Sequence, residues 1–225
     1  MRHTATLLAA LMFAFIARAA ETAPVPAPVV KPALPLRVIQ PTERAIFQRN
    51  ACGEGEVPVA AMIKDGQADT VEVRAINRAT KLPVREWEKV IPGTKLTLPA
   101  GWYQLEFRAM KAGAVLATGT VERVGVGEVF VTCGQSNSAN HGSPRQKAED
   151  DRVSSCSFLK VRWQHGDDPQ CGPSGTEGSP WALLGDLIAK QYDVPVGFFG
   201  VGVDSEDKIV KRAVISNQLS VKKGD

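Results

Sequence analysis

A short run that is typical of a β-strand, Glu128 to Cys133, ends abruptly at Gly134-Gln135-Ser136-Asn137. A strand that breaks at glycine can lift the next side chains out of the carboxyl edge of a sheet, where open α/β sheets bind their ligands. A serine there has an exposed hydroxyl that can act as a nucleophile, and its backbone N–H can help to form an oxyanion hole. The alternative is an ordinary turn with a capping serine, because these residue types are common in turns for local hydrogen-bonding reasons.

Val124 to Val131, which runs into this tetrapeptide and then into Ser138-Ala139-Asn140, resembles the first sequence block of the SGNH hydrolase superfamily. The similarity is to the sialate O-acetylesterase-like carbohydrate esterases in particular. A second stretch, Trp181 to Phe199, is similar to the helix and strand before their second block. The resemblance covers residues 124–203 and implies that Ser136 is the nucleophile of an enzyme that removes acetyl groups from sugars without a cofactor. It also implies that Gly134, Gln135 and Asn137 line the site.

Other parts of the family's site have no clear match. The family takes an oxyanion group from a glycine of its second block, and Gly202 is the nearest glycine to that position. Asp204-Ser205-Glu206 then stands where the family has paired glycines and a threonine. The sequence contains no Asp-x-x-His, the block that supplies the family's base and its orienting acid. The resemblance therefore implies a truncated or frame-shifted member with impaired activity.

Only two histidines lie outside the first residues of the chain, His141 and His165. His141 follows Ser136 by five residues and is expected to face elsewhere. His165, beside Asp167 and Asp168, could swing toward Ser136, but a histidine in a polar loop is more often a solvated surface residue. No spacing of potential ligands supports a metal site.

The amino terminus is typical of a secretory signal. Arg2 and His3 precede an apolar stretch, Leu7 to Ala17, that is too short to span a bilayer, and Ala17-Arg18-Ala19 fits cleavage after Ala19 or one residue later. We expect residues 1–19 to be removed and the protein to be secreted or periplasmic, without an integral membrane segment. The alternative is an uncleaved anchor.

The charge of the mature chain argues against nucleic acid as its partner. Loss of Arg2 and Arg18 with the leader would leave 25 basic and 24 acidic residues, out of 27 and 24 in the whole chain. A nucleic-acid-binding protein would favour a clustered basic surface. An acetylated carbohydrate, either sialic acid or a plant-wall polymer such as xylan, is the expected substrate.

Composition divides the rest of the chain into three segments. Residues 20–35 are rich in proline and indicate an extended linker. Residues 36–124 contain short alternating runs without a helical stretch, which favours a β-sandwich of immunoglobulin or fibronectin type. Within it, Trp87 or Trp102 could bind a sugar, although a core position is favoured for each. Residues 125–225 are predicted to be a partial SGNH hydrolase domain.

The fold class predicted for residues 125–225 is α/β, the start of a three-layer α/β/α flavodoxin-like domain. A long Gly/Ser/Pro/Asp-rich region over residues 138–179 is followed by Ser179-Pro180, which fits the start of a helix. Trp181, Leu184, Leu187 and Ile188 fall on one face of that helix. The apolar run over residues 194–203 is typical of a central parallel strand.

Four cysteines in an exported chain invite pairing. Cys156 and Cys171 bracket a Gly/Pro/Asp-rich loop and are the predicted disulfide; four free thiols are the alternative. Cys133 ends the predicted strand, where a thiol packs as a small apolar group.

The sequence is compatible with two functions. The first is an exported, impaired carbohydrate O-acetylesterase with Ser136 as nucleophile. The second is a non-catalytic exported β-sandwich protein that binds a glycan or a partner through residues 36–124.

Overall fold

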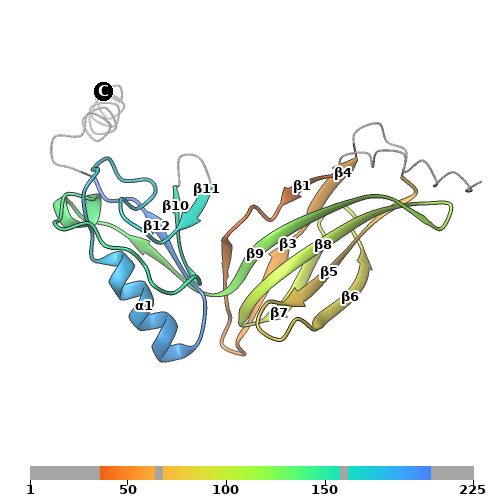
Figure 1. Cartoon of the computed structure of the whole chain (residues 1–225), viewed down its shortest axis with the longest axis horizontal. Helices are drawn as coiled ribbons and strands as arrows, with labels where there is room; N and C mark the ends of the chain where they lie inside the picture. Colours follow the sequence, from red (N-terminus) through yellow and green to blue (C-terminus); the bar gives the residue numbers. More distant parts are fainter. Residues whose placement is uncertain (1–35, 64–67, 158–161, 204–225) are drawn as a thin grey trace, which may run out of the picture. The chain divides into compact units, whose positions relative to one another are not determined.

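The computed structural model describes residues 36–63, 68–157 and 162–203 (Figure 1). The predicted signal peptide, the predicted linker and residues 204–225 lie outside the described residues. Within the described ranges, no helix is apolar over a length that would cross a membrane.

The first region consists of strands only. They are β1 (Leu36–Gln40), β2 (Ala45–Gln48), β3 (Glu54–Pro58), β4 (Ala60–Ile63), β5 (Thr70–Asn77), β6 (Pro83–Lys89), β7 (Lys95–Pro99), β8 (Gly101–Lys111) and β9 (Ala114–Thr132). The strands β6, β5, β8 and β9 form part of one large sheet, while β1 pairs with β4 and β3 with β7. Side chains from β1, β3, β5, β7, β8 and β9 meet in a single apolar core.

Alternation of apolar and polar residues explains this packing. In β7, Leu96 and Leu98 are completely buried, whereas the residues between and beside them are exposed. Tyr103 of β8 is buried as well, and its hydroxyl donates a hydrogen bond to the carbonyl oxygen of Pro99 at 2.7 Å. Burial raises the pKa of Tyr103 to about 12, so the phenol stays protonated in the core.

Strand β9 belongs to both regions of the molecule. It pairs with β8 as far as Val126 and then, from Glu128 to Thr132, lies parallel to β12 (Val196–Gly200). Figure 1 shows it as one continuous strand. The predicted boundary between residues 124 and 125 lies inside this strand, so a single sheet carries both regions.

The second region adds β10 (Val153–Ser157), β11 (Arg162–His165) and α1 (Trp181–Tyr192) to β12. The strand order is β11-β10-β12-β9, with β10, β12 and β9 parallel and β11 antiparallel. The helix and the central strand are those predicted from the sequence. Ser179 accepts the N–H of Trp181 at 3.3 Å and so assists the first turn.

Helix α1 packs closely on the sheet through small residues. A Cβ at Gly185 would lie 2.4 Å from Cγ1 of Val153 and 3.0 Å from the ring of Phe198, so only glycine fits there. The predicted apolar face is wrong in part, because Leu184 is 38 % and Leu187 65 % exposed. The buried face is instead centred on the small residues, which let the helix axis approach the strands.

The predicted fold class, the start of a three-layer α/β/α flavodoxin-like domain, is wrong. The protein is mostly β, with one large mixed sheet, and α1 is the only α-helix in the ranges that the structure describes. On the face of the sheet opposite α1, a Cβ at Gly197 would lie 2.9 Å from the Trp163 ring and 3.2 Å from Ile46 of β2. On that face the described residues place the Trp163 ring and Ile46 of β2, a strand that itself pairs with β9 in the same sheet, and no helix.

Arg44, in the turn before β2, connects the two regions. Its guanidinium donates to Asp151 Oδ1 at 3.0 Å, to the backbone carbonyl of Asp151, and to Val153 O at 3.2 Å. Arg123 of β9 donates to the other carboxylate oxygen of Asp151 at 3.1 Å. Burial acts to raise the pKa of Asp151, but these hydrogen bonds outweigh it and leave the pKa below its ordinary value.

Candidate active site

Ser136 lies just beyond the carboxyl end of β9, as the sequence predicts for a residue at the edge of the sheet. The chain leaves the strand through Gly134, at φ 126°, and enters the 3₁₀ turn η1 (Ser136–Ala139). Ser136 is exposed and has φ 46°, a left-handed conformation that is uncommon for a residue with a side chain. Strained backbone of this kind is often found at functional sites.

The structure brings Gly202 to the same turn. Beyond β12, Val201 N–H donates to Thr132 O at 2.9 Å and Val203 N–H to Gly134 O at 3.0 Å. A Cβ at Gly202 would lie 2.4 Å from Ser138 O, so the close approach of the two segments requires glycine. The predicted neighbours Gly134 and Gly202 therefore flank the turn that carries Ser136, while a role for them as oxyanion donors stays a prediction.

Gln135 and Asn137, the other predicted lining residues, are both exposed on this turn. Asn137 lines a pocket of about 260 Å³ together with Ser143, Gln146 and Ser179. The backbone N–H of Gly142 donates to Gly178 O at 2.8 Å, which closes one side of the loop around this pocket.

The segment after Ser136 is held by Asn140. This side chain is completely buried, accepts the N–H of Gln170 at 2.9 Å and donates to the Gln170 carbonyl oxygen at 2.9 Å. Gln170 Nε2 in turn donates to Gly166 O at 2.6 Å. The side-chain amide of Asn140 thus joins the loop after Ser136 to the loop that contains Gln170, because it bonds both the N–H and the carbonyl oxygen of Gln170.

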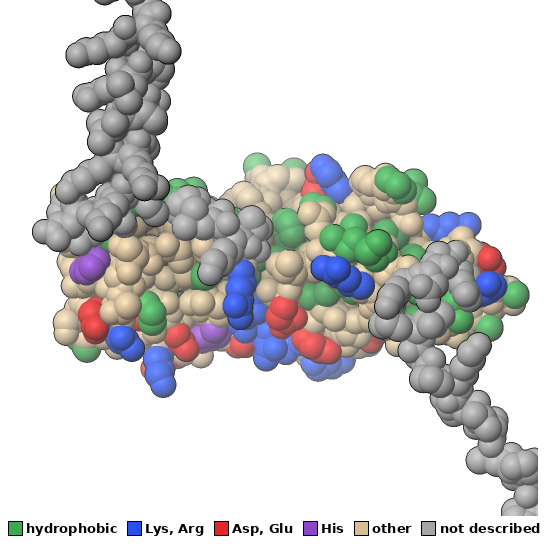
Figure 2. All heavy atoms as spheres, turned by 90° about the horizontal axis from the view of Figure 1, so that it is seen from above, with side chains coloured by type: hydrophobic (Ala, Val, Ile, Leu, Met, Phe, Trp, Pro, Cys, Tyr) green, Lys and Arg blue, Asp and Glu red, His purple; other side chains and the backbone are tan. Residues whose placement is uncertain are grey.

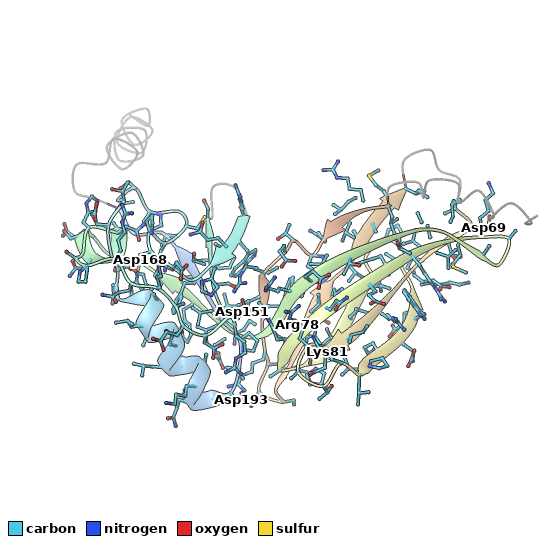
Figure 3. The ribbon with its side chains drawn as sticks, viewed as in Figure 1. Asp69, Arg78, Lys81, Asp151, Asp168 and Asp193 are labelled. Atoms are coloured by element: carbon cyan, nitrogen blue, oxygen red, sulfur yellow. The ribbon has the colours of Figure 1, made fainter. Side chains whose placement is uncertain are left out.

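Three aspartates hold the rest of the loop by accepting backbone N–H groups. Asp168, labelled in Figure 3, accepts the N–H of Gln146 at 2.9 Å and both the N–H and the hydroxyl of Ser179 at 2.8 and 2.6 Å. Asp167 accepts from Ala148, and Asp186 of α1 accepts from the two residues that follow Ala148. The loop beside Ser136 is therefore ordered by carboxylates as well as by buried apolar residues such as Ala148.

No local signal in the sequence identifies these positioning residues. Short polar side chains in a Gly/Pro-rich segment signal local turns, because they bond neighbouring backbone groups. The partners found here are 22 residues apart for Gln146 and Asp168, and 30 apart for Asn140 and Gln170. No local pattern connects such positions.

His165 is not placed to act on Ser136. It lies opposite Ser154, near the start of β10, whereas Ser136 follows the end of β9, which is level with Ser157. Three residues of strand rise and three strand spacings separate His165 from Thr132, the last residue of β9, about 10 Å along and about 14 Å across the sheet. His165 Nδ1 is instead 2.9 Å from Asp167 Oδ1. The backbone N–H of His141 bonds Ser136 O at 3.1 Å.

The predicted Cys156–Cys171 disulfide is not formed, and both thiols are free. Cys171 N–H donates to Ser155 Oγ at 3.2 Å, which puts its backbone on the face of β10 opposite the Cys156 side chain. A disulfide needs Cβ atoms that point toward each other. Burial, with a contribution from Cys171, raises the pKa of Cys156 to about 12 and keeps it a neutral thiol.

Within the described residues, no group of three or more histidine, cysteine, aspartate or glutamate side chains could hold a metal ion. No model of a known protein family, no curated protein and no solved structure matches this chain.

Proposed function

We propose that the protein is an exported carbohydrate O-acetylesterase with Ser136 as its nucleophile. The observation that carries the proposal is the exposed Ser136 at positive φ on the turn after β9, with Gly202 against the same turn. The resemblance of residues 134–137 to the Gly-Gln-Ser-Asn block of sialate O-acetylesterase-like enzymes supports the reaction and the substrate class. The predicted leader supports export.

In the proposed reaction, Ser136 Oγ forms a bond to the acetyl carbonyl carbon and its proton passes to a water molecule. Collapse of the tetrahedral intermediate breaks the bond between the carbonyl carbon and the sugar oxygen, which takes up a proton. Water then releases acetate from the acetylated serine. Because His165 lies near the start of β10 and away from the end of β9, we expect that it does not supply the base and that turnover is slow.

The charge pattern supports an uncharged or weakly charged substrate over nucleic acid. Figure 2 shows acidic and basic side chains side by side on the face in view. Several form ion pairs, such as Arg49 with Glu128 at 2.7 Å. Paired charges leave little attraction for a polyanion.

Covalent labelling tests the nucleophile without requiring fast turnover. Treatment with p-nitrophenyl acetate or a fluorophosphonate, followed by acid quenching and peptide mass spectrometry, should place the label on Ser136. Ser136→Ala should lose the label, and Ser138→Ala, on the same turn, should keep it.

A label confined to lysines, or equal labelling of both variants, would rule out the esterase proposal. That result would favour the non-catalytic alternative, an exported β-sandwich protein that binds a glycan or a partner.

A further inference from the structure

One face of the sheet formed by β6, β5, β8 and β9 carries an aromatic ring set among charged side chains. Trp87 of β6 is half-buried, and its ring centroid lies 4.1 Å from Arg108 Cζ and 4.8 Å from Arg74 Cζ. Cation–π contacts at these distances hold the ring in a defined orientation. Trp102, by contrast, is 8 % exposed and belongs to the interior.

Each of these guanidinium groups is also paired with a carboxylate across the sheet. Arg74 lies 2.7 Å from Glu106, and Arg108 lies 2.7 Å from Glu72, in both cases between residues directly opposite each other on β5 and β8. The side chains of the four residues are 18 to 32 % exposed. The cluster therefore presents donors and acceptors to solvent but carries no net charge.

A groove of about 340 Å³ lies beside the ring. Trp87, Glu106 and Arg108 line it together with Thr118 and Thr120 of β9. The register sets Thr118 opposite Arg108 and Thr120 opposite Glu106, so the threonines continue the same face of the sheet. The groove thus combines one aromatic surface, a guanidinium, a carboxylate and two hydroxyls.

We propose that this groove binds a neutral carbohydrate chain. A sugar ring offers C–H groups that pack on the indole and hydroxyls that both donate and accept, which matches the guanidinium, carboxylate and threonine groups. A polyanion would have to displace a carboxylate from each arginine, and a purely apolar ligand would leave the charged groups without water. The site is separate from Ser136 and does not depend on the esterase proposal.

Affinity electrophoresis of the whole protein in gels that contain soluble xylan or glucomannan tests the site. The wild-type protein should be retarded in at least one of these gels. Trp87→Ala should weaken the retardation about tenfold or more, because the aromatic contact is lost, while Trp87→Phe should keep part of it. Val84→Ala, on the same strand but outside the groove, is the matched control and should bind as the wild type does.

Ser136→Ala should leave retardation unchanged, which separates this site from the proposed esterase site. Circular dichroism and thermal melting establish that each variant is folded. The proposal is overturned if neither neutral polysaccharide retards the protein, if folded Trp87→Ala binds as the wild type does, or if only polygalacturonate or heparin is bound.

Discussion

In the region of β1 to β8 the buried side chains are almost all apolar, whereas in the region that follows β9 serines, an asparagine and a glutamine are buried among them. The first region has a core of fifteen buried apolar residues, and the second has a cluster of six, half of them alanine. Burial of large apolar side chains stabilises the first region. The second depends on hydrogen bonds between loops, such as those of Asn140 and Asp168.

The apolar core that stabilises the fold and the candidate site therefore lie in different regions of the molecule. Polar groups that are buried must be paired, and a network that pairs them specifies one arrangement of the loops. Such a network adds little net free energy per hydrogen bond but is costly to leave incomplete. The region that carries Ser136 is therefore ordered by hydrogen bonds between its buried polar groups. Some of its large apolar side chains are exposed, such as Val131, at 67 %, and Leu187, at 65 %.

The largest expected effect is on the apolar core of the first region. Phe107 is 1 % exposed, and Phe107→Ala should lower the free energy of unfolding by about 3–5 kcal/mol, since it removes buried contacts and leaves a cavity. Urea denaturation followed by tryptophan fluorescence measures the change. Leu187→Ala on α1, the matched control at an exposed site, should change it by no more than about 0.5 kcal/mol. Equal effects at the two positions would contradict the comparison.

A smaller and more local effect is expected from the polar network. Asn140→Ala leaves the buried N–H and carbonyl of Gln170 unpaired and should cost about 1–3 kcal/mol. Amide exchange should speed up around Gln170 while the amides of β8 keep their protection. Asn137→Ala, on the exposed part of the turn, is the control. Uniform acceleration through β8 would mean that the two regions open as one unit.

Acid should act mainly on ion pairs that involve the second region. A hydrogen bond from Arg152 lowers the pKa of Asp150, and one from Gln48 lowers that of Glu128. A carboxyl with a lower pKa in the folded state contributes stability above its ordinary pKa of about 4, and that contribution is lost as the pH falls through the folded value. Each should be worth about 1 kcal/mol or less, because solvent screens these partly exposed groups.

Thermal melts between pH 7 and pH 2 measure this loss. Asp150→Asn should be less stable than the wild type at pH 7, and the difference should disappear at the acid end of the series. A constant difference over the whole range would show that Asp150 acts by packing and not by its charge.

The smallest change in the free energy of unfolding is expected at the turn between β8 and β9. This turn belongs neither to the apolar core of the first region nor to the polar network of the second. Ala112 has φ 49° and Gly113 φ 80°, and Asp69 accepts the Ala112 N–H at 2.8 Å (Figure 3). A two-residue turn with positive φ at both positions favours Asn-Gly. Ala112→Asn should therefore raise the free energy of unfolding by about 0.5–1 kcal/mol in urea denaturation. Ala114→Asn, in the strand, should give no gain.

Much of the first region could be predicted because its signals are local. Alternation in β5, β7 and β8 and the turns between them are visible within a few residues of sequence. In the second region the strand before Gly134 and the helix after Pro180 were predicted for the same reason. The Cys156–Cys171 bridge was wrong because proximity in the chain does not determine which face of β10 a side chain occupies.

Apolar periodicity and turn chemistry by themselves determined several strands of the first region, the strand before Gly134, the central strand β12, the helix and the place of Ser136 beyond β9. They did not determine β10 and β11, which lie in the Gly/Ser/Pro/Asp-rich region over residues 138–179, where no strand was predicted. Only the tertiary structure decided that β9 runs through the predicted boundary, that β2 pairs with β9, and that Gly202 lies against the Ser136 turn. It also placed Trp163 and Ile46 on the face opposite α1. It also decided that His165 lies far from that turn. The physical reason is that apolar periodicity depends on residues that are neighbours in the chain. The register of a strand, the face on which a side chain lies and its hydrogen-bond partner depend instead on segments that are distant in the chain.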